Sequence, residues 1–156
     1  MGFYQFRKEQ LLHSGVDEVW DYISSPANLK DITPEYMGFD ITSENLPEKM
    51  YRGMIISYRV RPLLGIRITW VTEITEIAEK KFFIDQQRIG PYAFWHHQHF
   101  IEPVGEYVLM KDIVSYKPPF GILGSIANML VIRKKIQDIF DYREMVLNRR
   151  FPVKVY

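Results

Sequence analysis

The 156-residue sequence contains no cysteine, which excludes disulfide bonds and thiolate metal sites. It also lacks an excess of charge of either sign, because 20 Lys and Arg residues are balanced by 19 Asp and Glu residues. Domains that bind nucleic acid are usually basic, so this balance disfavours a nucleic-acid partner. No apolar run approaches the ~18 residues of a membrane-spanning helix, and we expect no integral membrane segment.

Several motifs that carry chemistry are absent as well. There is no Gly-rich phosphate loop, no Gly-x-Ser-x-Gly elbow and no His-Glu-x-x-His zinc motif. Nothing after Met1 has the apolar core of a signal peptide, and the lack of disulfides suits a reducing compartment. We therefore expect no cofactor, no bound metal and a cytoplasmic location.

Aromatic residues are what the chain has in abundance, with ten Phe, ten Tyr and three Trp making up 15% of the sequence. Such side chains bury large areas and line ligand pockets well. An aromatic β-protein with an ordinary core would have the same composition. The length predicts a single domain over residues 1–156.

The first third of the chain predicts one strand followed by two short helices. Residues 2–12 alternate as a strand does, and Ser14 followed by Asp17 is typical of a helix start. A second short helix is predicted to begin at Ser25-Pro26 and to end before Pro34. Six further strands are predicted where β-branched and aromatic residues gather between Pro, Gly or charged breaks, at 39–42, 54–61, 66–77, 81–89, 94–102 and 107–117.

The last part of the chain changes to helical periodicity. Residues 122–149 contain no proline and predict one long helix, well above the usual length. Its predicted buried face comprises Ile122, Ile126, Met129, Ile132, Ile136, Phe140, Arg143 and Leu147. The sheet is the only large partner for that face. We therefore predict an α+β fold: a curved seven-stranded antiparallel sheet wrapped around a long C-terminal helix, with two short helices after the first strand.

This order of elements resembles the START-like, or polyketide cyclase/dehydrase-like (SRPBCC), superfamily, whose architecture is the helix-grip fold. The similarity lies in residues 16–29, 85–100 and 110–121, and the last two segments are similar to a bacterial ligand-binding subgroup of unsettled function. Some members of that subgroup are labelled as possible cell-division inhibitors. The resemblance implies an internal cavity for a hydrophobic or amphipathic small molecule, such as a lipid or a polyketide-like compound.

The last hairpin carries the most informative polar residues. If residues 103–106 form its connection, paired positions sum to 209 and His97 lies opposite Asp112. Alternation then places His97, His99 and Asp112 on one face of the sheet. An Asp beside an imidazole favours its protonated form, so we predict a raised pKa for His97.

Three interpretations of the His97–Asp112 pair remain open: a satisfied polar pair in an apolar core, an anchor for a ligand, or a general acid–base pair. The pattern favours the first over the second and the second over the third. The predicted ligand-binding residues are Tyr58, Trp70, Trp95, His97, His99, Met110, Asp112, Val114 and Tyr116.

The function favoured by the sequence is non-enzymatic binding of a hydrophobic or amphipathic small molecule. One alternative is a polyketide cyclase or dehydratase that uses His97 and Asp112. Another is a protein-interaction or cell-division regulatory module with a collapsed cavity. The sequence does not determine the oligomeric state.

Overall fold

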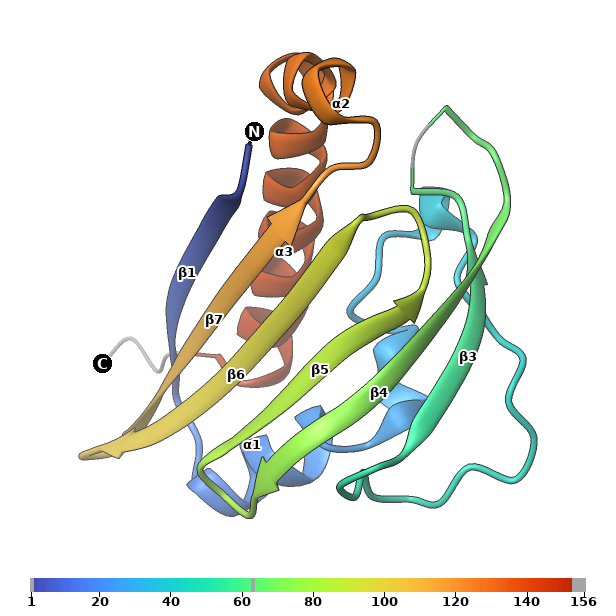
Figure 1. Ribbon diagram of the computed structural model, residues 1–156. Helices are drawn as coiled ribbons and strands as arrows, with labels where there is room; N and C mark the ends of the chain where they lie inside the picture. Colours follow the sequence, from blue (N-terminus) through green and yellow to red (C-terminus); the bar gives the residue numbers. More distant parts are fainter. Residues whose placement is uncertain (1, 63, 153–156) are drawn as a thin grey trace.

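Seven antiparallel strands form one curved sheet, and the C-terminal helix lies along its concave face (Figure 1). The computed structural model describes residues 2–62 and 64–152. The strand order is β1-β7-β6-β5-β4-β3-β2, so the first and last strands of the chain pair with each other. The predicted α+β helix-grip architecture is confirmed. The strands are β1 (Tyr4–Leu12), β2 (Asp40–Ile41), β3 (Ile55–Val60), β4 (Ile68–Ala78), β5 (Phe82–Ile89), β6 (Phe94–Val104) and β7 (Tyr107–Lys117).

Short helical segments connect β1 to β2. Helix α1 (Val16–Ile23) buries Val19, Trp20 and Ile23 against the sheet, and two 3-10 turns follow, η1 (Pro26–Leu29) and η2 (Glu35–Met37). The helix start is as expected, but Ser14 does not cap the freed amides. Its hydroxyl instead donates to the carboxylate of Glu18.

The hairpin between β6 and β7 differs in register from the prediction. Its connection is the two-residue turn Gly105-Glu106, so paired positions sum to 211, and His97 lies opposite Val114. Pro103 has no N–H group to donate, but it is tolerated inside β6 because β5 pairs only as far as Phe100. On that side of Pro103 the described chain has no strand whose carbonyl would need a donor. Gly105, at φ 60°, makes the tight turn possible. The shift is two residues, so every side chain keeps its predicted face.

The C-terminal helical segment consists of three parts, α2 (Gly121–Ala127), the π-helical turn η3 (Asn128–Ile132) and α3 (Arg133–Arg150). The predicted buried face is correct along α3, where Ile136, Phe140, Arg143 and Leu147 are buried. It is wrong for Ile122, Ile126 and Met129, which are exposed. Two causes account for this: α2 lies beyond the tip of β7, and the π-helical turn changes the phase of the helix (Figure 1).

The core fills the space between the concave sheet face and α3. The largest cluster joins α1 and the strands to Leu147, and a second joins Val114 and Tyr116 to Ile132, Ile136 and Phe140. Among residues 2–62 and 64–152, no helix has the length and apolar character needed to cross a membrane.

Candidate functional site: an apolar cavity with a buried histidine–carboxylate cluster

A cavity of about 160 Å³ lies between the concave sheet face and α3. Its walls come from the segment that holds η1 and η2, from β3 to β6 and from α3. Most of its lining is aromatic or aliphatic, and its aromatic members are Phe39, Tyr58, Trp70, Phe83, Tyr92, Trp95 and Phe140.

Three of these rings form a continuous aromatic wall. Trp70 contacts Trp95 edge to face at 5.3 Å between ring centroids, and Tyr92 lies 4.8 Å from Trp95. Burial raises the pKa of Tyr92, so its phenol is neutral at any ordinary pH. The buried indole nitrogen of Trp70 has no hydrogen-bond partner in the described chain. A buried donor without a partner is costly, so this nitrogen suits an acceptor brought by a ligand.

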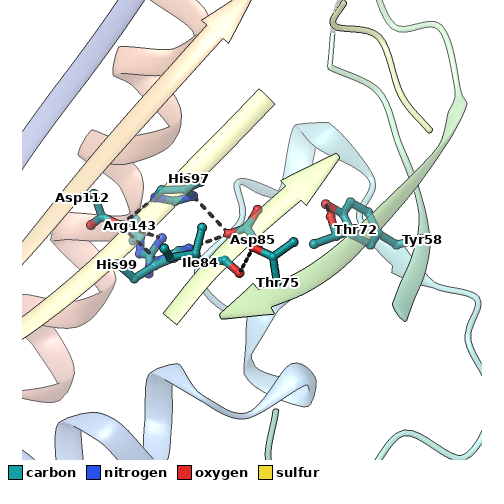
Figure 2. A network of polar contacts seen from close by, with 9 residues as sticks. All are labelled: Tyr58, Thr72, Thr75, Ile84, Asp85, His97, His99, Asp112 and Arg143. Atoms are coloured by element: carbon teal, nitrogen blue, oxygen red, sulfur yellow. Dashed lines mark hydrogen bonds and ion pairs between the residues drawn. The ribbon is translucent and has the colours of Figure 1, made fainter. Parts of the chain in front are cut away.

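Polar side chains meet at one end of the cavity because of strand alternation. His97 and His99 are two residues apart on β6, Asp85 pairs with His97 across β5, and Asp112 pairs with His99 across β7. Arg143 reaches the same point from α3, as Figure 2 shows. We refer to these five residues as the His–Asp cluster.

The contacts inside the His–Asp cluster are short. His97 Nε2 lies 2.8 Å from Asp112 Oδ1, and His99 Nε2 lies 2.6 Å from Asp85 Oδ2. The two imidazole rings lie side by side with centroids 3.6 Å apart. Arg143 Nη1 is 3.4 Å from Asp112 Oδ1, and its Nη2 is 3.4 Å from His99 Nδ1. Every member therefore has a charged or hydrogen-bonding neighbour.

These contacts indicate which ring nitrogens donate. Carboxylates only accept, so each imidazole donates from Nε2, His97 to Asp112 and His99 to Asp85. The Nδ1 atom of His99 lies 3.2 Å from Asp112 Oδ1 and 3.4 Å from Arg143 Nη2, so it can donate to the carboxylate when the ring is protonated or accept from the guanidinium when the ring is neutral.

Burial and neighbouring charge oppose each other at these groups. Burial and the adjacent His99 lower the pKa of His97 to about 4, although both carboxylates act to raise it. The predicted raised pKa of His97 is therefore wrong. Burial disfavours the ionised form of Asp112, but the Arg143 guanidinium and the hydrogen bonds from both imidazoles hold its pKa well below the usual value. The pKa of Asp85 is likewise lowered by the imidazoles against the effect of its burial.

The predicted site residues separate into two groups. Tyr58, Trp70, Trp95, His97 and His99 line the cavity. Met110, Asp112, Val114 and Tyr116 are buried but do not line it. They lie on β7, which is covered by α3 rather than by the cavity. Asp112 still contacts both histidines behind the lining, so the structure brings together the three polar residues predicted to meet.

Two members of the cluster, Asp85 and Arg143, were not among the predicted site residues. Both line the cavity. The signal for Arg143 is its place on the otherwise apolar stripe of the helix, since a buried arginine needs an acidic partner. The signal for Asp85 is its phase on β5, two residues from the buried Phe83.

The residues Asp85, His97 and His99 could offer three ligand atoms to a metal, all within 4.8 Å of one another. The fit is poor, because tetrahedral ligands at ~2.0–2.1 Å from zinc stand about 3.3 Å apart. Asp85 Oδ2 and His99 Nε2 are only 2.6 Å apart, because a hydrogen bond joins them. Arg143 also places a positive charge next to His99, which would repel a cation. The absence of a metal stays a prediction.

Comparison with solved structures shows the fold. The chain superposes on the protein TTHA0849 from Thermus thermophilus with a TM-score of 0.66 at 16% identity, covering 95% of this chain and 97% of that one. Major latex-like protein 151 from Panax ginseng gives a TM-score of 0.69 at 13% identity, covering 97% and 99%. A protein from Arthrobacter aurescens gives 0.71 at 12%, covering 93% and 86%. The chain thus has a START/SRPBCC-like fold, as the sequence indicated. No family model and no curated protein matches the sequence.

Proposed function

We propose that this protein binds a hydrophobic or amphipathic small molecule in the cavity and does not transform it. The observation that carries the proposal is the lining: a mostly aromatic and aliphatic wall that includes a few polar groups, most of them in the His–Asp cluster. Ligand sites have this composition, because apolar contact supplies affinity and a few polar groups orient the ligand. We infer a cytoplasmic location from the absence of cysteine.

The size of the cavity favours a compact ligand. A volume of about 160 Å³ is close to that of an apolar cavity that accepts benzene, ~150 Å³, and is below the ~300–1,000 Å³ of larger ligand pockets. A ring system of the polyketide type fits this space better than an extended lipid chain. A lipid would need the walls to move apart.

The polar end favours a ligand with a neutral acceptor. The buried Nε atoms of Trp70 and Arg143 lack partners in the described chain, and both residues line the cavity. A carbonyl or hydroxyl oxygen would satisfy either donor after a small movement of the surrounding side chains, because neither nitrogen has accessible surface in this structure. A carboxylate is disfavoured, because it would lie close to the carboxylates of Asp85 and Asp112, whose pKa values are lowered.

The pKa of His97 argues against an enzyme. A general base works best when its pKa lies near the working pH, and a pKa of about 4 makes His97 a weak base at neutral pH. Its Nε2 proton is also held by Asp112. Binding without turnover is the better account of these residues.

Titration with 2-naphthol, a compact aromatic hydroxyl compound, tests the proposal through tryptophan fluorescence. Ile139→Trp fills the cavity from α3 and should abolish saturable quenching, whereas Ile113→Trp, on a residue that does not line it, should not. Native mass spectrometry of gently purified protein should reveal a retained small molecule in the wild type and none in Ile139→Trp. Equal binding by both variants, with no retained molecule, would show that the cavity is not a ligand site.

A further inference from the structure

A second feature lies outside the cavity, where β7 joins the C-terminal helix. The residues from Phe120 to Val131 form an apolar projection at one end of the molecule, which we call the apolar tip (Figure 1). Its large side chains are mostly exposed, with Phe120 at 83%, Ile122 at 81% and Met129 at 74% of their full accessible area. The other exposed members are Leu123, Ile126, Leu130 and Val131.

The apolar tip is held with its apolar side outward. Its inward positions are the buried Gly124 and Asn128, and Asn128 accepts a hydrogen bond of 2.8 Å from the Tyr116 hydroxyl. A side chain at position 124 would not fit, since an added Cβ would lie 1.8 Å from the carbonyl oxygen of Pro119. A helix in water normally buries its large apolar residues and exposes its polar ones. This segment does the reverse, so its outer face is made for an apolar environment.

Charge around the apolar tip indicates which environment that is. No Asp or Glu occurs between Asp112 and Asp138, whereas Lys117, Arg133, Lys134 and Lys135 flank the tip. The nearest acidic group along the helix is Asp138, which pairs with Lys134. A second copy of the chain would bring two such basic sets together, and like charges repel. An anionic bilayer offers an apolar interior and negative headgroups in one surface.

We propose that the apolar tip inserts into the interfacial region of an anionic lipid bilayer, with Arg133 and Lys134 against the headgroups. The tip is too short to span a bilayer, so it would lie at the surface. The inference stands on the exposed residues and their charges and does not depend on a ligand in the cavity. The segment continues directly into the cavity wall at Lys135 and Ile136, which brings the cavity close to the membrane.

Vesicle flotation tests the insertion with two lipid compositions, equimolar phosphatidylglycerol–phosphatidylcholine and pure phosphatidylcholine. Wild-type protein should float with the anionic vesicles. Leu123→Glu with Leu130→Glu should reduce the partition coefficient more than tenfold, because charged groups then enter the apolar layer. Leu64→Glu is the matched control, since Leu64 is 91% exposed but lies in the β3–β4 loop, and it should float like wild type.

The basic residues are tested separately on the same vesicles. Arg133→Gln with Lys134→Gln should weaken binding to the anionic vesicles about 25-fold, at about fivefold for each cation lost. Lys30→Gln with Lys81→Gln removes the same charge from elsewhere and should change binding far less. Equal binding of wild type to pure phosphatidylcholine would remove the role assigned to the cations.

Two outcomes would overturn the whole proposal. One is wild-type protein that floats with neither vesicle. The other is a dimer in light scattering that Leu123→Glu with Leu130→Glu dissociates, with no vesicle binding, since the tip would then be covered by a second copy. Circular dichroism should show that each variant keeps the fold, as expected for exposed positions.

Discussion

The two halves of the C-terminal helical segment are both rich in apolar residues, yet only one half buries them. Along α3, Ile136, Phe140 and Leu147 pack against the sheet, and Arg143 enters the His–Asp cluster. Along α2 and η3, the buried positions are instead Gly124 and Asn128, apart from Ile132 at the junction with α3. Apolar periodicity therefore identifies the faces of a helix, but burial also requires a partner surface. The sheet ends before α2 and supplies none.

The largest expected difference between the two halves concerns their cations. Arg143→Met should lower the free energy of unfolding by about 3–5 kcal/mol, because it leaves two buried carboxylates without their guanidinium. Lys134→Met, the matched change near the tip, should change the free energy of unfolding far less, because its ion pair with Asp138 is exposed. Urea unfolding of the two variants measures the difference. Equal costs would mean that the cluster is not electrostatically coupled.

Acid should destabilise the protein through the His–Asp cluster, where α3 meets the sheet, and not through the apolar tip. In the unfolded chain His97 gains its proton near pH ~6.5, whereas in the folded protein it does so only near pH 4. The unfolded state thus binds more protons between these values, and stability should fall by about 3 kcal/mol as pH drops from 6.5 to 4. His97→Gln should flatten this part of the stability profile, as measured by urea unfolding across this pH range. Asp112, with its lowered pKa, contributes stability that is lost only below pH ~3.9.

The substitution Asp112→Asn separates the effect of the Asp112 carboxylate on the pKa of His97 from the effect of burial. Both its charge and its hydrogen bond raise the pKa of His97, so the variant should titrate His97 still lower than about 4. NMR titration of the imidazole signals reads this directly. A His97 that titrates higher in the variant would contradict the assigned contacts.

A single methylene gives the smallest and cleanest comparison. Ile136→Val on α3 should cost about 1 kcal/mol, because Ile136 is buried and lines the cavity. Ile122→Val in the apolar tip should change stability by less than about 0.5 kcal/mol, because its side chain is exposed. Thermal unfolding of each variant and of the wild type measures both costs. A cost at Ile122 as large as at Ile136 would mean that the tip is packed in solution.

Much of the fold follows from local pattern. Alternating apolar residues, short connections and one long helical pattern predict the sheet and the helix that covers it from the sequence alone. The polar face of β6 and β7 was also predictable, because an error of two residues in the register leaves His97, His99 and Asp112 on the same side.

The rest of the site depends on contacts between distant segments. Asp85 joins the cluster through the pairing of β5 with β6, and Arg143 joins it through the position of α3 on the sheet. Neither placement has a local signal strong enough to identify the partner. The pKa of His97 was predicted with the wrong sign because the sequence indicates a nearby carboxylate but not full burial or a second imidazole at 3.6 Å.

The His–Asp cluster ties α3 to three adjacent strands, because its members come from β5, β6, β7 and the helix. Separating α3 from the sheet at this point would leave buried charges without partners. We therefore expect this part of the cavity to be rigid. Met37, Phe39 and Pro62 line the cavity without belonging to the cluster, so we expect widening for a larger ligand to occur among such residues. A ligand bound as proposed would therefore be held more selectively at the His–Asp cluster than at the rest of the cavity.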